Sequence, residues 1–387
     1  GRHQELLQAN GQAMEDQLRY RRLVESERDQ ACSAYTAEAQ RRAQYSKLLD
    51  IFASLVRTKR SEERCRTHTY CRMRPCPHGG SDTCTICACH IITDKTVGLS
   101  MGTIGGVRQK ANWECDQIWP PEAQPEDMFH AFRPLVHEAF EGCHTLLVAC
   151  GAKGSGKTHT LMGSSDNGGG GLVCIAIQEA YARAQSTAHG PRLQLSCSVL
   201  ADLGDSVMDL LFSVNPDDSD ISADGAPKRV VCPTAGAMWD VICAGEQQRA
   251  EVHRQRETPL SSSHLIVTIN IDGGGSTGKF TFVDLASQMG ADNCALNPLR
   301  DWADTMSACM VGGVNYQGTQ ISTMLTQAVQ RCRRLNILVH ATPCTEDAEI
   351  TKQCLLVVSR IRLLASYVST HNLHLQPPSL LPVTGRG

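Results

Sequence analysis

The feature that most constrains this chain is the octapeptide from Gly151 to Thr158, which reads Gly-Ala-Lys-Gly-Ser-Gly-Lys-Thr. It matches the phosphate-binding pattern G-x-x-x-x-G-K-[ST] at every fixed position. The apolar run before it, residues 144–150, suits a buried strand, and the residues after it can begin a helix. This arrangement directs backbone N–H groups and a helix N-terminus at a polyphosphate. The octapeptide therefore predicts an α/β fold with a nucleotide site.

The loop also assigns chemical roles to single residues. Lys157 is expected to reach the β- and γ-phosphates, and Thr158 to ligate Mg²⁺. A β-rich run ends at Asp284, as a Walker B strand ends in an acid, so we expect Asp284 to hold Mg²⁺, usually through water. The predicted cofactors are ATP or ADP with Mg²⁺. The other residues expected around the phosphates are Gly151, Ala152, Lys153, Gly154, Ser155 and Gly156.

Composition limits the remaining classes of function. The chain has 387 residues, of which 41% are hydrophobic and 20% charged, so it can bury a substantial core. Its net charge of −3 excludes the global basicity of a protein that coats nucleic acid. The longest apolar runs are too short for a membrane helix, and no signal peptide is visible. The 19 scattered cysteines predict reduced thiols rather than a disulfide scaffold. We therefore expect neither nucleic acid nor membrane as a partner.

Residues 1–66 differ in composition from the rest. They are rich in Gln, Glu, Arg and Ala and lack Pro, and one apolar set follows helical spacing: Tyr45, Leu48, Phe52 and Leu55. This predicts a neck helix with a weak coiled-coil stripe, through which the chain would form a homodimer or a heterodimer. A solvated helix that packs on its own domain remains the alternative.

From residue 67 onward, short apolar runs alternate with helical patterns, which indicates a layered α/β domain over 67–368. The residues from 369 to 387 are predicted to be a disordered tail. The expected strands are 67–73, 85–92, 144–150, 192–200, 264–272 and 279–284. Examples of expected helices are 126–140, 156–162, 173–186, 235–252 and 319–332, with loops at 164–171 and 214–226.

Four sequence blocks resemble those of a kinesin motor domain, in the same order and with similar spacing. The blocks are CRMRP at 71–75, GAKGSGKTHTLMG at 151–163, ETPLSSSH at 257–264 and DLASQM at 284–289. They are similar to the kinesin CRxRP segment, phosphate loop, switch I (NxxSSRSH) and switch II (DLAGSE). A helix that runs directly into the CRMRP strand resembles the C-terminal-motor, minus-end-directed kinesins, in which a coiled-coil neck precedes the motor.

The resemblance implies a P-loop NTPase fold with a central mixed sheet of about eight strands and helices on both faces. It implies that Arg72 and Pro75 flank the adenine and that His159 belongs to the cofactor-binding loop. It also implies that Ser261 contacts Mg²⁺ or the γ-phosphate. Ser261 and Asp284 are therefore the predicted catalytic residues, and together with Thr158 they are the predicted magnesium ligands.

Both switch blocks depart from the kinesin pattern. In kinesins an Arg of switch I pairs with a Glu of switch II, and those positions hold Ser262 and Met289 here. The switch II Gly whose amide senses the γ-phosphate is Ser287, and the switch I Asn is Glu257. Each lost preorganised donor typically costs about 10²–10³ in rate. We therefore expect hydrolysis to be very slow or absent.

The segment that resembles the kinesin YRDSKLT motif is also altered. It reads YQGTQIS from Tyr316 to Ser322, without the Arg and the Lys. Tubulin has an acidic surface, so fewer cations predict weaker docking. Arg331, Arg333 and Arg334 lie nearby in sequence and are either basic contacts or a solvated helix end.

The leading hypothesis is a kinesin-like, microtubule-associated nucleotide-binding protein with weakened or absent hydrolysis. The alternatives are an active ATP-driven minus-end motor, a non-motile partner subunit and a nucleotide-gated scaffold. The resemblance implies tubulin as a partner and a cytoplasmic, cytoskeletal location, with the spindle as one option.

A cysteine-rich segment offers a second candidate site. Cys84, Cys87, Cys89 and His90 follow one another closely, with two further ligand types upstream, Cys76 and His78. Zinc is one interpretation, but a single CxxC is weak support. The other interpretation is a strand in which cysteines are ordinary apolar residues.

Overall fold

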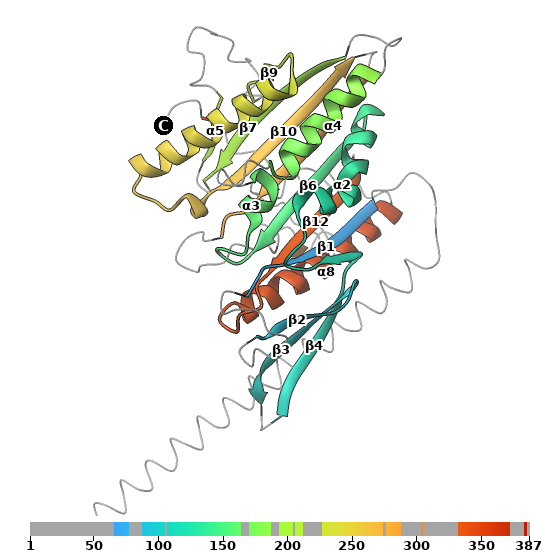
Figure 1. Cartoon of the computed structure of the whole chain (residues 1–387), viewed down its shortest axis with the longest axis vertical. Coiled ribbons are helices and arrows are strands. Elements are labelled where there is room, and N and C mark those ends of the chain that lie inside the picture. The colour runs from blue at the N-terminus through green and yellow to red at the C-terminus, as the bar shows by residue number, and fades with distance from the viewer. Residues whose placement is uncertain are drawn as a thin grey trace, which may run out of the picture. The chain divides into compact units, whose positions relative to one another are not determined.

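A mixed β-sheet of ten strands forms the centre of the part that the structure, a computed structural model, describes (Figure 1). The order along the sheet is β13-β8-β7-β10-β11-β6-β12-β1-β5, and β9 pairs with β7. The described residues are 66–76, 87–104, 107–163, 170–186, 193–203, 206–211, 227–273, 276–287, 300, 303–304, 332–371 and 383–384. The strands are β1 (Arg66–Met73), β5 (Gln117–Trp119), β6 (His144–Gly151), β7 (Gln194–Asp202), β8 (Val207–Asp209), β9 (Val230–Val231), β10 (His264–Gly273), β11 (Ser276–Asp284), β12 (Cys332–Ala341) and β13 (Val383–Thr384).

The middle of the sheet is parallel. Strands β11, β6, β12, β1 and β5 run in one direction, while β10 pairs antiparallel with both β11 and β7. Asp284 at the end of β11 is in register with Ala149 of β6, and His340 of β12 is in register with Gly151. The carboxyl ends of three parallel strands therefore meet where the phosphate-binding loop leaves β6, which is where ligands bind in sheets of this kind.

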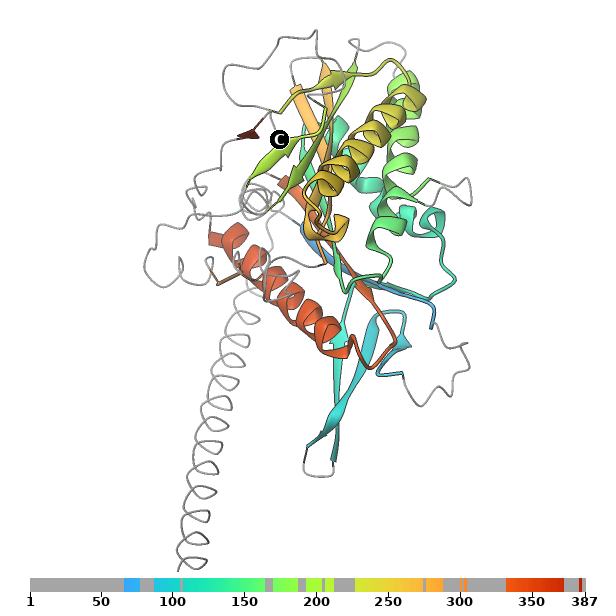
Figure 2. The same ribbon diagram turned by 90° about the vertical axis from the view of Figure 1, so that its left-hand side faces the viewer.

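Helices cover both faces of the sheet, as predicted (Figure 2). Helices α2 (Pro125–Phe140), α3 (Lys157–Met162), α4 (Leu172–Ser186) and α5 (Ala235–Gln255) lie on one face, and α8 (Ala348–His371) lies on the other. The start of α5 is capped by Thr234, whose hydroxyl accepts the N–H of Ala237 at 3.1 Å. Among the described helices, none combines the length and the apolar character that a membrane crossing requires.

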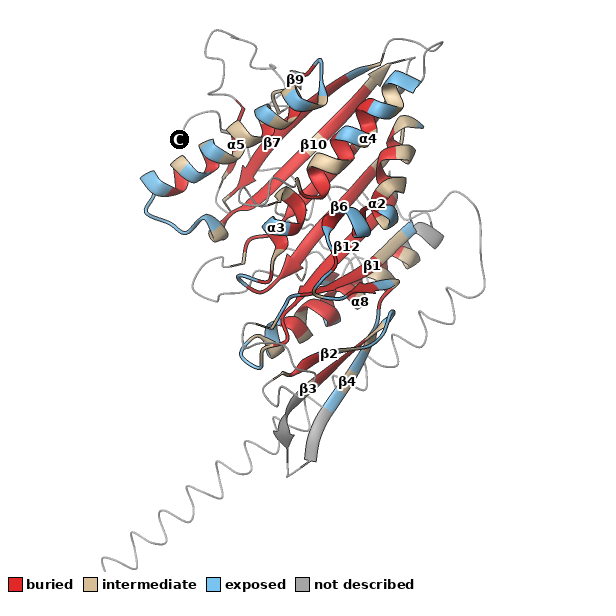
Figure 3. Ribbon diagram, in the orientation of Figure 1, coloured by how far each residue is buried: buried red, intermediate tan, exposed pale blue. Residues whose placement is uncertain are grey.

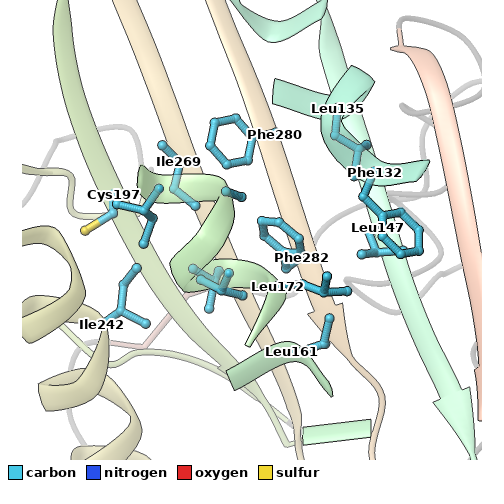
Figure 4. Packing of buried hydrophobic residues seen from close by; sticks show 14 of the residues in the cluster. Phe132, Leu135, Leu147, Leu161, Leu172, Cys197, Ile242, Ile269, Phe280 and Phe282 are labelled. Atoms are coloured by element: carbon cyan, nitrogen blue, oxygen red, sulfur yellow. The ribbon is translucent and has the colours of Figure 1, made fainter. Parts of the chain in front are cut away.

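Strand β6 shows how the sequence builds the two layers. Alternate side chains of a strand point to opposite faces. Leu146 and Val148 pack with α8, while Leu147 and Ala149 pack with α2 and α4. Figure 4 shows part of the apolar cluster on the face that α2 and α4 cover. In this cluster, Phe280 and Phe282 of β11 lie near one another with a ring-centroid distance of 6.0 Å. Burial on both faces explains why this strand reads as one continuous apolar run (Figure 3).

Three antiparallel strands form a separate small sheet, namely β2 (Cys89–Thr93), β3 (Thr96–Ile104) and β4 (Val107–Glu114). Val97 and Leu99 of β3 are fully buried in the same cluster as α8. The expected strand over 85–92 corresponds in part to β2. Strands β3 and β4 were not among the expected elements, and neither were β12 and α8.

Most expected elements appear with shifts of a few residues at their ends. The helix expected over 319–332 lies outside the described residues, except Cys332, which begins β12. The predicted neck, residues 1–66, lies outside them as well, except Arg66, which begins β1. Within the predicted tail, the structure describes the last turn of α8 and β13, which pairs with β8. The domain boundaries therefore stay predictions.

The environment of Arg334 differs from both of the predicted ones. Its sequence context suggested a basic contact for tubulin or a solvated helix end. Instead it lies in β12, is buried, and pairs with Glu138 of α2 at 2.9 Å. It is therefore held inside the fold, while Arg331 and the side chain of Arg333 lie outside the described residues.

Candidate nucleotide site

The phosphate-binding loop has the backbone that its glycines predict. Gly151, Gly154 and Gly156 have φ angles of 151°, 76° and 96°, which side chains rarely adopt. A Cβ atom on Gly151 would lie 2.4 Å from the carbonyl oxygen of His340, so close packing on β12 also requires glycine. Gly156 is the N-cap of α3, and Lys157 is its first residue. The predicted strand, loop and helix start are therefore present.

The ammonium group of Lys157 is buried and makes three hydrogen bonds. It donates to the carbonyl oxygens of Gly151 and Ala152, at 2.8 and 3.0 Å, and to the hydroxyl of Ser287 at 2.6 Å. Lysine has three N–H donors, so all are used. Burial lowers the pKa of Lys157, and the neighbouring Asp284 opposes that shift. The loop lysine therefore contacts switch II directly.

The predicted magnesium ligands lie together at the end of β11. The Thr158 hydroxyl donates to Oδ2 of Asp284 at 2.5 Å. The second carboxylate oxygen, Oδ1, is buried and has no hydrogen-bond partner among the described residues, and the same holds for the hydroxyl oxygens of Ser155 and Ser261. Burial raises the pKa of Asp284, against the effects of Thr158, Lys157 and Arg249. Buried oxygens without partners are costly, and a hard cation takes oxygen ligands of this kind. The residues present therefore fit a magnesium ion.

Backbone and side-chain bonds join the two switch segments. The N–H of Ser287 donates to the carbonyl oxygen of Ser261 at 2.8 Å. Nδ1 of His264 accepts the N–H of Ala286 at 2.9 Å. Burial, with Arg249 and Lys157 nearby, lowers the pKa of His264 to about 3, so the ring is neutral. The hydroxyl of Ser262, at the kinesin Arg position, donates locally to the carbonyl oxygen of Pro259 at 2.6 Å. Met289 lies outside the described residues.

An ion pair on α5 lies beside this site, and the sequence reasoning missed it. Arg249 makes two bonds to Glu246, at 2.9 and 2.6 Å, and donates to the carbonyl oxygen of Ser263 at 3.3 Å. The Arg249 side chain is only 4% exposed. Burial raises the pKa of Glu246. Arg249 opposes this shift, and the negative charge of Asp284 adds to it. An i, i+3 Glu–Arg pair just before the switch block was the available signal.

Arg72 is buried rather than on an open surface. It donates to the hydroxyl of Thr160 at 2.5 Å and to the carbonyl oxygen of Ala123 at 3.1 Å. His340 shares the same hydroxyl at 2.8 Å. Three predicted cofactor residues, Pro75, Lys153 and His159, are exposed. Their contacts with a nucleotide stay predictions.

The cysteine-rich segment does not assemble as the zinc hypothesis required. Cys89 is buried and His90 is exposed on the opposite side of β2, so the two do not converge. Among the described residues, no group of three or more His, Cys, Asp or Glu side chains could hold a metal ion. Cys84 and His78 lie outside the described part of the chain.

The fold and this site define a P-loop nucleotide-binding domain of the α/β class. The sequence profile of the Kinesin motor domain matches residues 72–363, about three quarters of the chain. The chain therefore belongs to the kinesin family, whose motor domain binds ATP or ADP, and the predicted resemblance is confirmed.

Curated relatives include kinesins of the kinesin-14, or C-terminal-motor, group. Kinesin-like protein KIN-14O of Oryza sativa subsp. japonica is 25% identical over 337 residues, 77% of this chain and 54% of that protein. Kinesin-like protein KIN-14I of the same organism is 23% identical over 285 residues, 66% of this chain and 23% of that protein. Kinesin-like protein KIN-7D, mitochondrial, of Arabidopsis thaliana is 23% identical over 287 residues, 67% of this chain and 27% of that protein. The chain thus spans from about a quarter to about half of these relatives.

Solved structures confirm the predicted fold. A fast kinesin superposes with a TM-score of 0.64 at 18% identity, covering 77% of this chain and 91% of that one. Drosophila NOD superposes with a TM-score of 0.60 at 17% identity, covering 79% of this chain and 99% of that one. In that second structure NOD is docked on the microtubule.

Proposed function

We propose that this chain is a microtubule-associated kinesin head that binds Mg²⁺ with ATP or ADP and hydrolyses ATP very slowly or not at all. One observation carries the proposal. Ser287 accepts a hydrogen bond from Lys157 and donates its own N–H to Ser261. The groups that should respond to a γ-phosphate are thus bonded to one another.

The chain's own residues divide the binding work. The backbone from Gly151 to Gly156 and the start of α3 would hold the phosphates, because successive N–H groups converge there. Thr158, Asp284 and Ser261 would hold Mg²⁺ through their oxygen atoms. The bound ion would neutralise developing charge on the phosphates, and Asp284, in its dry setting, would fix its position.

Hydrolysis needs more than binding. A water must be positioned, and charge stabilisation must be in place beforehand. Ser262 cannot supply the cation of the kinesin switch pair, and its hydroxyl is engaged locally. The nearby cation, Arg249, is committed to Glu246 and Ser263. Binding competence with poor turnover follows from this combination.

Tubulin is the proposed partner, and the cytoskeleton the proposed location. Membership of the kinesin family supports this, and so does the similarity to NOD, which is docked on microtubules in its own structure. The missing Arg and Lys of the Tyr316–Ser322 segment argue for weak binding. Pairing through residues 1–66 with a second kinesin chain would raise the effective affinity of the assembly.

A working, slow minus-end motor is the second candidate. The specific observation in its favour is that the Lys157, Thr158 and Asp284 set is complete and assembled. A motor would show phosphate release that microtubules stimulate. A partner subunit would bind microtubules with little turnover, and a nucleotide-gated scaffold would bind nucleotide without tubulin.

Measurements of equilibrium binding can distinguish a nucleotide-gated scaffold from the microtubule-binding candidates without kinetic measurements. Titration calorimetry with Mg-ADP and Mg-ATP should give saturable binding to the full chain, and the Lys157→Ala variant should bind at least tenfold more weakly. Microtubule cosedimentation at low and moderate salt should show binding that falls as salt rises. Absence of nucleotide binding by the parent chain would refute the proposal, and binding to nucleotide without microtubules would select the scaffold.

A further inference from the structure

Three cysteines from separate parts of the chain meet at one end of the large sheet. Cys76 follows β1, Cys87 precedes β2, and Cys344 lies between β12 and α8. The sulfur atoms of Cys76 and Cys87 are 3.7 Å apart. Cys87 and Cys344 face each other in an isolated antiparallel bridge. All three are partly exposed, and the nucleotide chemistry uses none of them.

The backbone holds the two closest thiols in place from both sides. The N–H of Arg74 donates to the carbonyl oxygen of Ala341 at 2.9 Å. The N–H of Ala88 donates to the carbonyl oxygen of Pro343 at 2.8 Å. Cys76 and Cys87 are thus each within two residues of an anchor, one at the end of β12 and one just after it. Thiols placed in this way can reach bonding distance with small rotations of their side chains.

Partial exposure distinguishes this pair from other neighbouring cysteines. Cys197 and Cys232 interact, as do Cys150 and Cys354, but all four are buried. Thiol hydrogen bonds to Cys354 and Cys232, together with burial, raise the pKa of Cys150 and Cys197 respectively, which disfavours the reactive thiolate. An oxidant from solvent therefore reaches the Cys76–Cys87 pair more readily than these two.

We propose that Cys76 and Cys87 form a reversible disulfide, a redox-sensitive modification site that links the end of β1 to the start of β2. With a hydroperoxide as oxidant, the Cys76 thiolate attacks one peroxide oxygen, and the O–O bond breaks to give a sulfenic acid and hydroxide. The Cys87 thiolate then attacks the Cys76 sulfur and expels hydroxide, which is protonated to water. Two thiols lose two electrons, the peroxide gains them, and two waters form from hydrogen peroxide.

The disulfide would act close to the nucleotide site. It would join Cys76 to Cys87 covalently and restrain the segment from Arg74 to Cys76. The guanidinium of Arg74 lies 3.3 Å from the position of a Cβ atom on Gly154, so this segment borders the phosphate loop. A closed loop also lowers the entropy of the unfolded chain, so the oxidised protein should melt at a higher temperature.

Peptide mapping of the full chain tests the proposal directly. The chain is treated with a small excess of hydrogen peroxide, remaining thiols are alkylated, and the protein is digested with trypsin and Asp-N without reductant. Trypsin cleaves after Arg72 but not before Pro75, and Asp-N cleaves before Asp82 and Asp94. Peptides 73–81 and 82–93 should therefore appear joined, with fragmentation locating the bond at Cys76 and Cys87, and dithiothreitol should separate them.

Two variants make the result specific. Cys76→Ser should abolish the joined peptide and the oxidation-induced rise in melting temperature. Cys143→Ser, which alters a partly exposed thiol elsewhere, should change neither. Full alkylation of both thiols after peroxide treatment would overturn the proposal, as would a bond from Cys76 to Cys84. Stoichiometric zinc that protects these thiols from alkylation would replace the disulfide with a metal site.

Discussion

The ammonium nitrogen of Lys157 lies 2.6 Å from the hydroxyl oxygen of Ser287, and this bond joins the phosphate loop to switch II. Kinesins have a glycine where Ser287 stands, so the side chain that makes the bond is a departure of this chain from its family. The same residue bonds through its backbone to Ser261 of switch I. Ser287 therefore connects all three segments of the site.

Substituting Ser287 by Gly should strengthen nucleotide binding. The serine hydroxyl competes with phosphate oxygens for the lysine, and a hydrogen bond to a charged group contributes about 1.5–3 kcal/mol. The dissociation constant for Mg-ATP should fall about 10-fold, as measured by titration calorimetry. Ser262→Ala is the matched control, since that hydroxyl donates locally to the carbonyl oxygen of Pro259. An unchanged constant in Ser287→Gly would show that the bond does not oppose binding.

Glu257 should be the site of a stabilising substitution. It follows the end of α5 with a φ of 52°, while Thr258 donates to the carbonyl oxygen of His253 at 3.0 Å, as in a Schellman motif. Glycine adopts this conformation without the steric cost of a Cβ atom. Glu257→Gly should raise the free energy of unfolding by about 1 kcal/mol in urea titrations. Glu257→Gln keeps the Cβ atom and should give no gain; equal gains in both variants would argue against backbone strain.

The Glu246–Arg249 pair should matter far more than its neighbour on the same helix. Glu251 and Arg254 have the same spacing, but Arg254 is 74% exposed whereas Arg249 is 4% exposed. Glu246→Ala leaves a buried guanidinium without its carboxylate and should cost about 2–4 kcal/mol of unfolding free energy. Glu251→Ala should leave stability nearly unchanged. Equal losses in the two variants would contradict the burial of the first pair.

Acid should destabilise the fold through His264. Its pKa is about 3 in the folded chain against 6.5 for the free side chain, so below pH 6.5 the unfolded state binds a proton that the folded state does not. Stability then falls as the pH drops, by about 2 kcal/mol between pH 7 and pH 5. His264→Asn keeps an acceptor and should remove that part of the slope. Asp284 is common to both proteins, and its raised pKa, which favours folding at low pH, cancels in the comparison.

The control for this prediction is His90→Asn, because His90 is exposed on β2. Urea titrations at pH 5, 6 and 7 should give the parent slope for His90→Asn and a shallower slope for His264→Asn. If both variants kept the parent slope, the neutral burial of His264 would not account for acid sensitivity.

Features that depend on a short stretch of consecutive residues could be predicted from the sequence. The phosphate loop, its strand and the acid at the end of β11 each depend on a few consecutive residues, and the structure brings them together. Strand β12 was missed because buried polar residues interrupt its apolar pattern; Asn336 and His340 lie among Leu335, Ile337 and Val339. His340, for example, shares a hydrogen bond of 2.8 Å with Thr160, which is far away in sequence.

Contacts between segments that are far apart in the sequence could not be predicted from any local pattern. Cys344 joins Cys87 only because β12 returns to the middle of the sheet beside β1. Arg334 looked available for a partner, yet Glu138 neutralises it across the fold. In both cases the residue was visible in the sequence, but its contacts depend on the tertiary packing.

Binding without turnover is tested most directly by steady-state phosphate release from Mg-ATP by the full chain, with and without microtubules, beside the Lys157→Ala variant. Binding without turnover predicts that the parent releases phosphate no faster than this variant under either condition, although it binds nucleotide. Phosphate release that microtubules stimulate in the parent, and that Lys157→Ala abolishes, would contradict the account and identify a working motor.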